Sequence, residues 1–199
     1  MHASSTDLVA LLGSRICHDL ISPISAIGNG VELMMMSGAV PGPELTLISE
    51  SVSSAKARIR FFRIAFGAAE AGQRVASAEI RSILDDMTRG GRLKIAWEVP
   101  GDVDRPMVKL AFLALQCLET ALPYGGRVRV AEAAGRWQIA AEATSTKVDP
   151  ALWQALGSAS PATGLAPAQV QFALLPAELA RHGKQLAVTH SEGGIALAF

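Results

Sequence analysis

The sequence predicts a protein of two parts within 199 residues, a helical hairpin followed by an α+β sandwich. The hairpin is predicted by apolar residues that recur every three or four positions through residues 12–34 and again through 48–66. The sandwich is predicted by short alternating or apolar segments, separated by glycine turns, after about residue 75. We therefore expect a helical domain at 1–72 and an α/β domain at 73–199.

The first helix starts near residues 4–6, whose hydroxyls suit a helix N-cap, and ends at residues 37–38. Pro23 lies inside it and removes one backbone hydrogen bond, which predicts a kink just after His18. One face of the helix carries an apolar stripe, made of Leu12, Ile16, Leu20, Ile24, Ile27, Val31 and Met34.

A turn over residues 39–43 leads into a second helix that starts at Glu44 and fades at residues 67–72. Its apolar face carries Ile48, Val52, Ala55, Ile59, Phe62 and Phe66. Two long helices joined by a short turn form an antiparallel hairpin, which cannot enclose a core alone. We expect two copies to pair about a two-fold axis into a dimeric four-helix bundle. The alternative is that the hairpin packs on the second domain within one chain.

The second part alternates helices and strands. Pro106 suits a helix start, and the helix after it is apolar almost all the way round, as a buried helix would be. In chain order we expect helix 78–88, strand 93–99, helix 107–122, strands 127–131 and 137–141, helices 150–156 and 168–181, and closing strands 185–189 and 195–199. This order predicts a mixed sheet with helices on one face.

Composition excludes several classes of function. Hydrophobic residues make up 50% of the chain, charged residues 18%, and the formal net charge is zero. Because the sequence shows no basic patch, we expect no nucleic-acid partner. Because it shows no long apolar run and no signal peptide, we expect no membrane partner. We therefore expect a cytoplasmic protein whose two thiols are unpaired and buried, on Cys17 and Cys117.

His18 and Asp19 are the residues that suggest chemistry. On a helical wheel His18 falls opposite the apolar stripe, so its ring should face solvent. An imidazole titrates near neutral pH and is a nucleophile when neutral, and a neighbouring carboxylate can orient the ring or hold a proton. A metal site is disfavoured because the remaining histidines lack ligand spacing. These are His2, His182 and His190.

The run from His18 to Ile27, HDLISPISAI, resembles the phospho-acceptor box of histidine kinase dimerisation domains. Continued to Leu33, it is most similar to the ChpT-type histidine phosphotransferases of alphaproteobacteria. The resemblance implies that His18 accepts a phosphoryl group and that Asp19 orients or assists it. The polar residues on the same helix face are then candidate contacts for a docking partner, or simply a solvated face: Ser14, Arg15, Ser22, Ser25 and Asn29.

The second domain resembles the ATP-binding domain of histidine kinases with its nucleotide motifs degraded. Cys117 stands where active kinases carry a magnesium-binding asparagine, and a thiol cannot replace a hard oxygen ligand. Residues 143–147, ATSTK, stand where the resemblance would place the adenine-contacting Asp-x-Gly-x-Gly motif. We therefore expect this chain to bind no nucleotide, no other cofactor and no metal.

The resemblance implies a homodimeric phosphorelay carrier. His18 would take a phosphoryl group from the aspartyl phosphate of one receiver domain, in an upstream hybrid kinase, and pass it to the receiver of a downstream response regulator. Magnesium is expected on the receiver domains. The alternatives are an active ATP-dependent histidine kinase and a dimerisation scaffold whose histidine is incidental.

Overall fold

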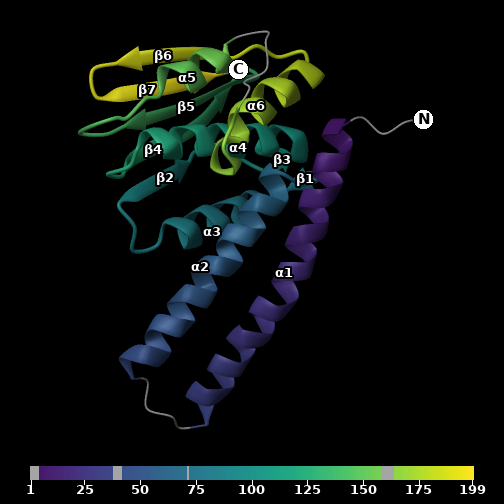
Figure 1. Ribbon diagram of the computed structural model, residues 1–199, viewed down its shortest axis with the longest axis vertical. Coiled ribbons are helices and arrows are strands. Elements are labelled where there is room, and N and C mark those ends of the chain that lie inside the picture. Colours follow the sequence, from purple (N-terminus) through teal and green to yellow (C-terminus); the bar gives the residue numbers. More distant parts are fainter. Residues whose placement is uncertain (1–4, 38–41, 71, 158–163) are drawn as a thin grey trace.

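The computed structural model describes residues 5–37, 42–70, 72–157 and 164–199. Its first two helices, α1 (Ser5–Met36) and α2 (Pro43–Ala65), form the predicted hairpin. Figure 1 shows this hairpin projecting from an α/β domain, with its closed end furthest from the domain. The predicted start of α1 at residue 4, most of the turn at 39–43 and most of a loop at 157–167 lie outside the described residues.

The α/β domain contains four α-helices, a short 3₁₀ helix and seven strands within the described residues. The helices are α3 (Ser77–Thr88), α4 (Arg105–Ala121), α5 (Pro150–Leu156), η1 (Pro167–Gln169) and α6 (Gln171–Arg181). The strands are β1 (Arg74–Val75), β2 (Leu93–Trp97), β3 (Val103–Asp104), β4 (Gly126–Ala133), β5 (Arg136–Glu142), β6 (Ala187–Ser191) and β7 (Gly194–Ala198).

The main sheet has five strands in the order β2-β4-β5-β7-β6. Strands β2 and β4 are parallel and the other neighbours are antiparallel, so the predicted mixed sheet is confirmed. Strands β1 and β3 pair separately as a two-residue antiparallel ladder. The sequence did not predict these two strands, because two residues are too few to show alternation.

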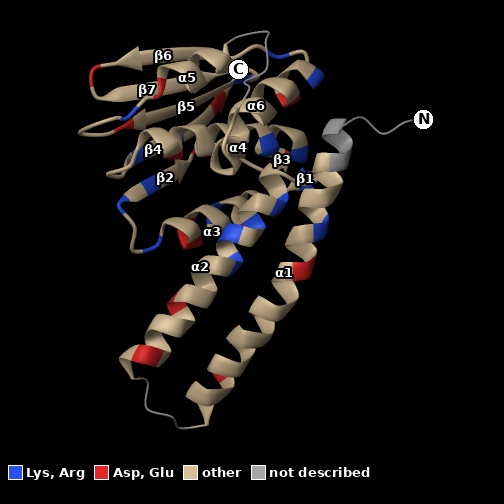
Figure 2. Cartoon of the chain, in the orientation of Figure 1, with Lys and Arg blue, Asp and Glu red and all other residues tan. Residues whose placement is uncertain are grey.

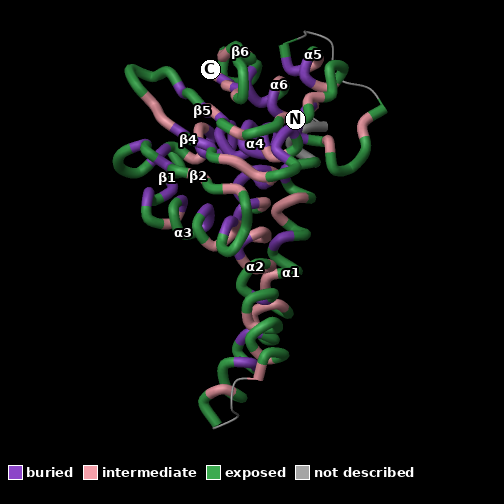
Figure 3. The backbone as a smooth tube through the Cα atoms, turned by 90° about the vertical axis from the view of Figure 1, so that its left-hand side faces the viewer, coloured by how far each residue is buried: buried purple, intermediate pink, exposed green. Residues whose placement is uncertain are grey.

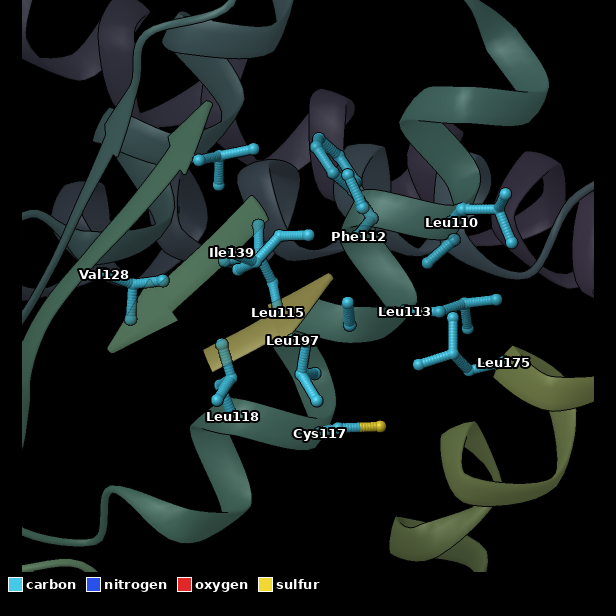
Figure 4. Close-up of a cluster of buried hydrophobic side chains, with 14 of the residues drawn as sticks. Leu110, Phe112, Leu113, Leu115, Cys117, Leu118, Val128, Ile139, Leu175 and Leu197 are labelled. Carbon is cyan, nitrogen blue, oxygen red and sulfur yellow. The ribbon is translucent and has the colours of Figure 1, made fainter. Parts of the chain in front are cut away.

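One face of the sheet is covered by helices. Along β4 and β5 buried and exposed residues alternate, and the buried set includes Val128 and Ile139. Helix α4 lies against this face and is buried on almost every side, as predicted. Figure 4 shows Leu115 and Leu118 of α4 beside Ile139 and the β7 residue Leu197. This layer of side chains is the core of the domain.

The end of α2 also belongs to that core. The ring of Phe61 stacks on that of Phe112 in α4, with centroids 4.4 Å apart and planes at 6°. Arg105, at the start of α4, donates to the carbonyl oxygens of Arg63 at 2.9 Å and Ala68 at 3.0 Å. At this end the hairpin therefore packs on the second domain within one chain. The fully buried aromatic residue is Phe61, and the predicted Phe62 is only partly buried.

The two helices of the hairpin approach closely at Gly28. A Cβ at this position would lie 2.7 Å from Lys56 Nζ and 3.1 Å from Val52 Cγ1, so a larger residue would displace the end of the Lys56 side chain and press on Val52. Val31, one turn further along α1, is buried at the same seam. Glycine and a β-branched residue thus form the contact between α1 and α2.

Most of the predicted apolar stripe is exposed in the single chain. Figure 3 shows the hairpin as largely exposed and the α/β domain as the buried part of the molecule. The exposed apolar residues of the two predicted helix faces are Leu12, Ile16, Leu20, Ile27, Met34 and Ile48. Met34 of that stripe and the neighbouring Met36 are 52% and 83% exposed in one chain. A hairpin buries only the strip where its two helices face each other.

Among the described helices, none combines the length and apolar character that a membrane span requires.

Candidate functional site

His18 lies on α1 about one helical turn beyond the place where that helix meets the α/β domain. The Ser14 hydroxyl accepts a hydrogen bond from the backbone N–H of Ala68 at 3.1 Å. At Gly13 a Cβ would lie 3.0 Å from the carbonyl oxygen of Phe66, so the absence of a side chain permits the close approach. The His18 side chain is 81% exposed. The helix is therefore anchored at its base while the imidazole is open to a partner.

Three side chains on α1 form a chain of hydrogen bonds. His18 Nδ1 lies 3.1 Å from Asp19 Oδ1, and Arg15 Nε donates to Asp19 Oδ2 at 2.7 Å. An ionised carboxylate only accepts hydrogen bonds, so Nδ1 of His18 must carry the proton in this contact. In the neutral ring, Nε2 then holds the lone pair, and Nε2 has no hydrogen-bond partner within the described part of the chain.

The same contacts change the acidity of Asp19. The hydrogen bond from His18, and then the guanidinium of Arg15, lower the pKa of the Asp19 carboxyl below its ordinary value. The carboxylate is therefore ionised at neutral pH. Charged residues are otherwise sparse on α1 and on the far half of α2 (Figure 2). The arrangement presents a nucleophilic nitrogen beside a fixed negative charge.

The other predicted contact residues divide into two groups. Ser22 and Asn29 are exposed on the His18 face of α1 and are available to a partner. Ser14 and Ser25 are half-buried: the hydroxyl of Ser14 is used within the chain, and Ser25 lines a groove of about 700 Å³ between α1, α2 and α3. His18 is not among the residues that line this groove. The structure thus joins Arg15, Asp19 and His18, and leaves Ser22 exposed on the same helix.

The two segments that the resemblance compares with nucleotide-binding motifs are part of the packed domain. Cys117 is fully buried, and burial raises the pKa of its thiol. Figure 4 shows this residue on α4 among the aliphatic side chains of the core. The backbone N–H of Lys147 donates to the carbonyl oxygen of Ala121 at 2.9 Å, which holds the 143–147 segment against the end of α4. Both thiols are free and buried, as predicted.

No group of three or more His, Cys, Asp and Glu side chains that could hold a metal ion occurs in the part of the chain that is described.

Sequence reasoning missed a buried ion pair at the junction of the two parts. Lys109 Nζ donates to Glu178 Oε1 at 2.8 Å and to the carbonyl oxygen of Gly67 at 3.1 Å. Both side chains are only 5% exposed. The available signal was a lysine near the start of an otherwise apolar helix, but nothing in the sequence indicated its partner on α6. This pair ties α4 to α6 and to the segment that follows α2.

Comparison with known proteins decides the family. Residues 77–194 match the family profile described as "Histidine phosphotransferase C-terminal domain". "Protein phosphotransferase ChpT" of Brucella abortus (strain 2308) is 35% identical over 183 residues, which cover 88% of this chain and 87% of that protein. This chain belongs to the histidine phosphotransferase family. It is a phosphorelay histidine phosphotransferase, as the phospho-acceptor box predicted, and the kinase and scaffold alternatives are not favoured.

A solved phosphotransferase structure agrees with this assignment. The structure titled "1.7 Angstrom Structure of a Bacterial Phosphotransferase" aligns with a TM-score of 0.68 and 29% identity, over 100% of this chain and 98% of that chain. The histidine kinase domain from the Erythrobacter litoralis EL346 blue-light activated histidine kinase aligns with a TM-score of 0.48 and 14% identity, over 94% and 90% of the two chains.

Proposed function

We propose that His18 is the phosphoryl acceptor of this phosphotransferase and that Asp19 orients its ring. The observation that carries the proposal is the exposed imidazole whose Nδ1 is bonded to a carboxylate, so that Nε2 faces solvent. A partner protein can reach this atom without moving α1. The anchoring of α1 at Ser14 supports the same conclusion, since a fixed helix holds the nucleophile at a constant position.

The proposed reaction balances without an external proton. The lone pair of His18 Nε2 attacks the phosphorus of an aspartyl phosphate on a receiver domain, and the bond from phosphorus to the aspartyl oxygen breaks as the Nε2–P bond forms. The receiver leaves with a free carboxylate, and the ring becomes a phosphorylated cation that keeps its Nδ1 proton. Asp19 offsets that positive charge. Transfer to the aspartate of a second receiver reverses these bond changes.

The receiver domains of response regulators and of hybrid kinases are the proposed partners. They dock on the polar face of α1, where Arg15, Ser22 and Asn29 are exposed, with Ser25 and Ser14 at its margin. We expect a magnesium ion on the receiver domain to neutralise the charge on the phosphoryl oxygens.

We also propose that the protein is a homodimer. The apolar stripe of α1 and its continuation on α2 are exposed along the hairpin, on side chains that are about half accessible. Contiguous apolar surface of this kind marks an interface. Pairing two hairpins about a two-fold axis buries both stripes in a four-helix bundle and leaves the His18 face outward.

Phosphotransfer from a labelled receiver tests the proposed function. The purified protein is incubated with a phosphorylated receiver domain and magnesium, and the label on each protein is followed over time. We expect acid-labile, alkali-stable label on the wild type and on the control His182→Gln, which changes an exposed histidine at the end of α6. His18→Gln should accept none. Label on His18→Gln, or equal label from ATP alone, would overturn the proposal.

A further inference from the structure

The guanidinium of Arg15 and the imidazole of His18 share one carboxylate. Arg15 Nε bonds Asp19 Oδ2 at 2.7 Å while His18 Nδ1 bonds Asp19 Oδ1 at 3.1 Å. Each oxygen of Asp19 therefore has its own donor, and both donors precede Asp19 on α1. A carboxylate held at both oxygens cannot rotate without breaking one of the two bonds.

The contribution of this ion pair to stability is small. The side chains of Arg15 and Asp19 are 73% and 49% exposed, and exposed pairs four residues apart on a helix add little to the free energy of folding. The pair nevertheless includes the carboxylate that contacts the ring of His18, the proposed nucleophile. A function in the reaction explains its position better than a function in folding.

We propose that Arg15 is a positioning residue for phosphoryl transfer: by holding Asp19 it fixes the Nδ1–H form of His18, so that the phosphoryl group enters and leaves at Nε2. This inference rests on the proposed function of His18 as the acceptor. Without Arg15, the exposed Asp19 carboxylate is free to turn toward water, and the ring loses the contact that selects one tautomer.

Arg15 also keeps the proton on the ring. Its positive charge is among the causes that lower the pKa of Asp19, so the carboxylate accepts the hydrogen bond without taking the Nδ1 proton when the ring becomes cationic. When the second receiver removes the phosphoryl group, the electron pair of the Nε2–P bond returns to Nε2. The ring is then neutral with its proton where it began, and the carrier is ready for another cycle.

The competing interpretation is that Arg15 contacts the receiver directly. Both interpretations predict slower transfer from a phosphorylated receiver, so that reaction alone does not separate them. Phosphoramidate does, because it is a small donor with no docking surface. Its phosphorus is attacked by Nε2, its N–P bond breaks, and ammonia leaves from the zwitterionic form while the ring keeps its Nδ1 proton.

The test compares Arg15→Gln and Arg15→Lys with the wild type, with Asp19→Asn, and with Arg127→Gln as a matched control at an exposed arginine of β4. Three measurements are made on each full-length protein: the ring tautomer of His18, from its ¹⁵N shifts, the rate of phosphorylation by phosphoramidate, and the KM for a phosphorylated receiver domain. We expect Nδ1–H in the wild type and the control. In Arg15→Gln we expect a mixture of tautomers and a rate about tenfold lower, the effect of weakening one charge-assisted hydrogen bond.

Arg15→Lys should restore part of the Nδ1–H tautomer and part of the phosphorylation rate, since an ammonium keeps the charge but not the geometry of Nε. If Arg15→Gln keeps the wild-type tautomer and the wild-type rate with phosphoramidate, and changes only the KM for the receiver, Arg15 is a docking residue and the inference is wrong. Failure of the wild type to accept phosphate from a receiver would instead reject the proposed function, and His18→Gln run in parallel identifies that case.

Discussion

Replacing Lys109 with methionine breaks the buried ion pair at the junction of the hairpin and the α/β domain. Methionine has nearly the length of the lysine stem but no ammonium group. Glu178 Oε1 loses a donor at 2.8 Å, and the carbonyl oxygen of Gly67 loses one at 3.1 Å. Because the Glu178 side chain is only 5% exposed, water cannot replace the lost donor freely. The substitution leaves a buried carboxylate without its main partner.

The size of the effect follows from this burial. Removing one partner of a buried ion pair costs about 3–5 kcal/mol. Arg181 Nη1 lies 3.6 Å from Glu178 Oε1 and partly compensates the charge, so we expect the lower end, about 3 kcal/mol. In a domain of this size, each kcal/mol lowers the Tm by about 2–4 °C, which gives a decrease of about 6–12 °C.

Urea denaturation of three variants measures the effect. Lys109→Met should lose about 3 kcal/mol, whereas the double variant Lys109→Met/Glu178→Leu should regain most of the loss, because an apolar pair needs no solvation. Lys94→Met, at an exposed lysine of β2, is the control and should change little. A loss below about 1 kcal/mol in the single variant, within the range of exposed pairs, would refute the reasoning from burial.

Three more outcomes test other parts of the molecule. The hydrogen bond from His18 and the charge of Arg15 lower the pKa of Asp19, so its carboxylate should take up a proton only below the usual value of about 3.9 as the pH falls. A ¹³C titration of the Asp19 carboxyl should show this low midpoint, and Arg15→Gln should raise it. Cys117→Asn should lower the Tm by burying an unpaired amide and should still bind no ATP in calorimetry. Ile16→Glu, in the exposed stripe, should turn the proposed dimer into a monomer in light scattering without loss of helix content.

Periodicity predicted the hairpin and the main elements of the domain because long elements repeat their pattern several times. The apolar helix after Pro106, the strand pair that follows it and the short helix at 150–156 all appear where expected. The structure adds a cap to the short helix, where the Asp149 carboxylate accepts from the N–H of Ala151 at 3.0 Å. Short elements such as β1 and β3 contain too few residues to show a pattern. Strands β1 and β3 are defined by their pairing with each other, which joins two segments that are distant in the sequence.

The site was predictable in part because it lies on a long helix whose pattern repeats over several turns. The outward direction of His18 follows from its place on the helical wheel, whereas its contact with Asp19 does not, because adjacent residues of a helix do not face each other. The bond between Arg15 and Asp19 depends on rotamers, which sequence does not specify. The partner of Lys109 lies on α6, 69 residues away, and only the fold brings the two together.

The location of the phosphoryl group tests the central claim most directly. The full-length protein is phosphorylated by a receiver domain, digested at alkaline pH to preserve phosphohistidine, and sequenced by tandem mass spectrometry. We expect the phosphoryl group on His18 in the peptide that contains it, and no modification when ATP replaces the phosphorylated receiver. A phosphoryl group on any other residue, or an unmodified His18 after complete loss of label from the receiver, would contradict the proposal.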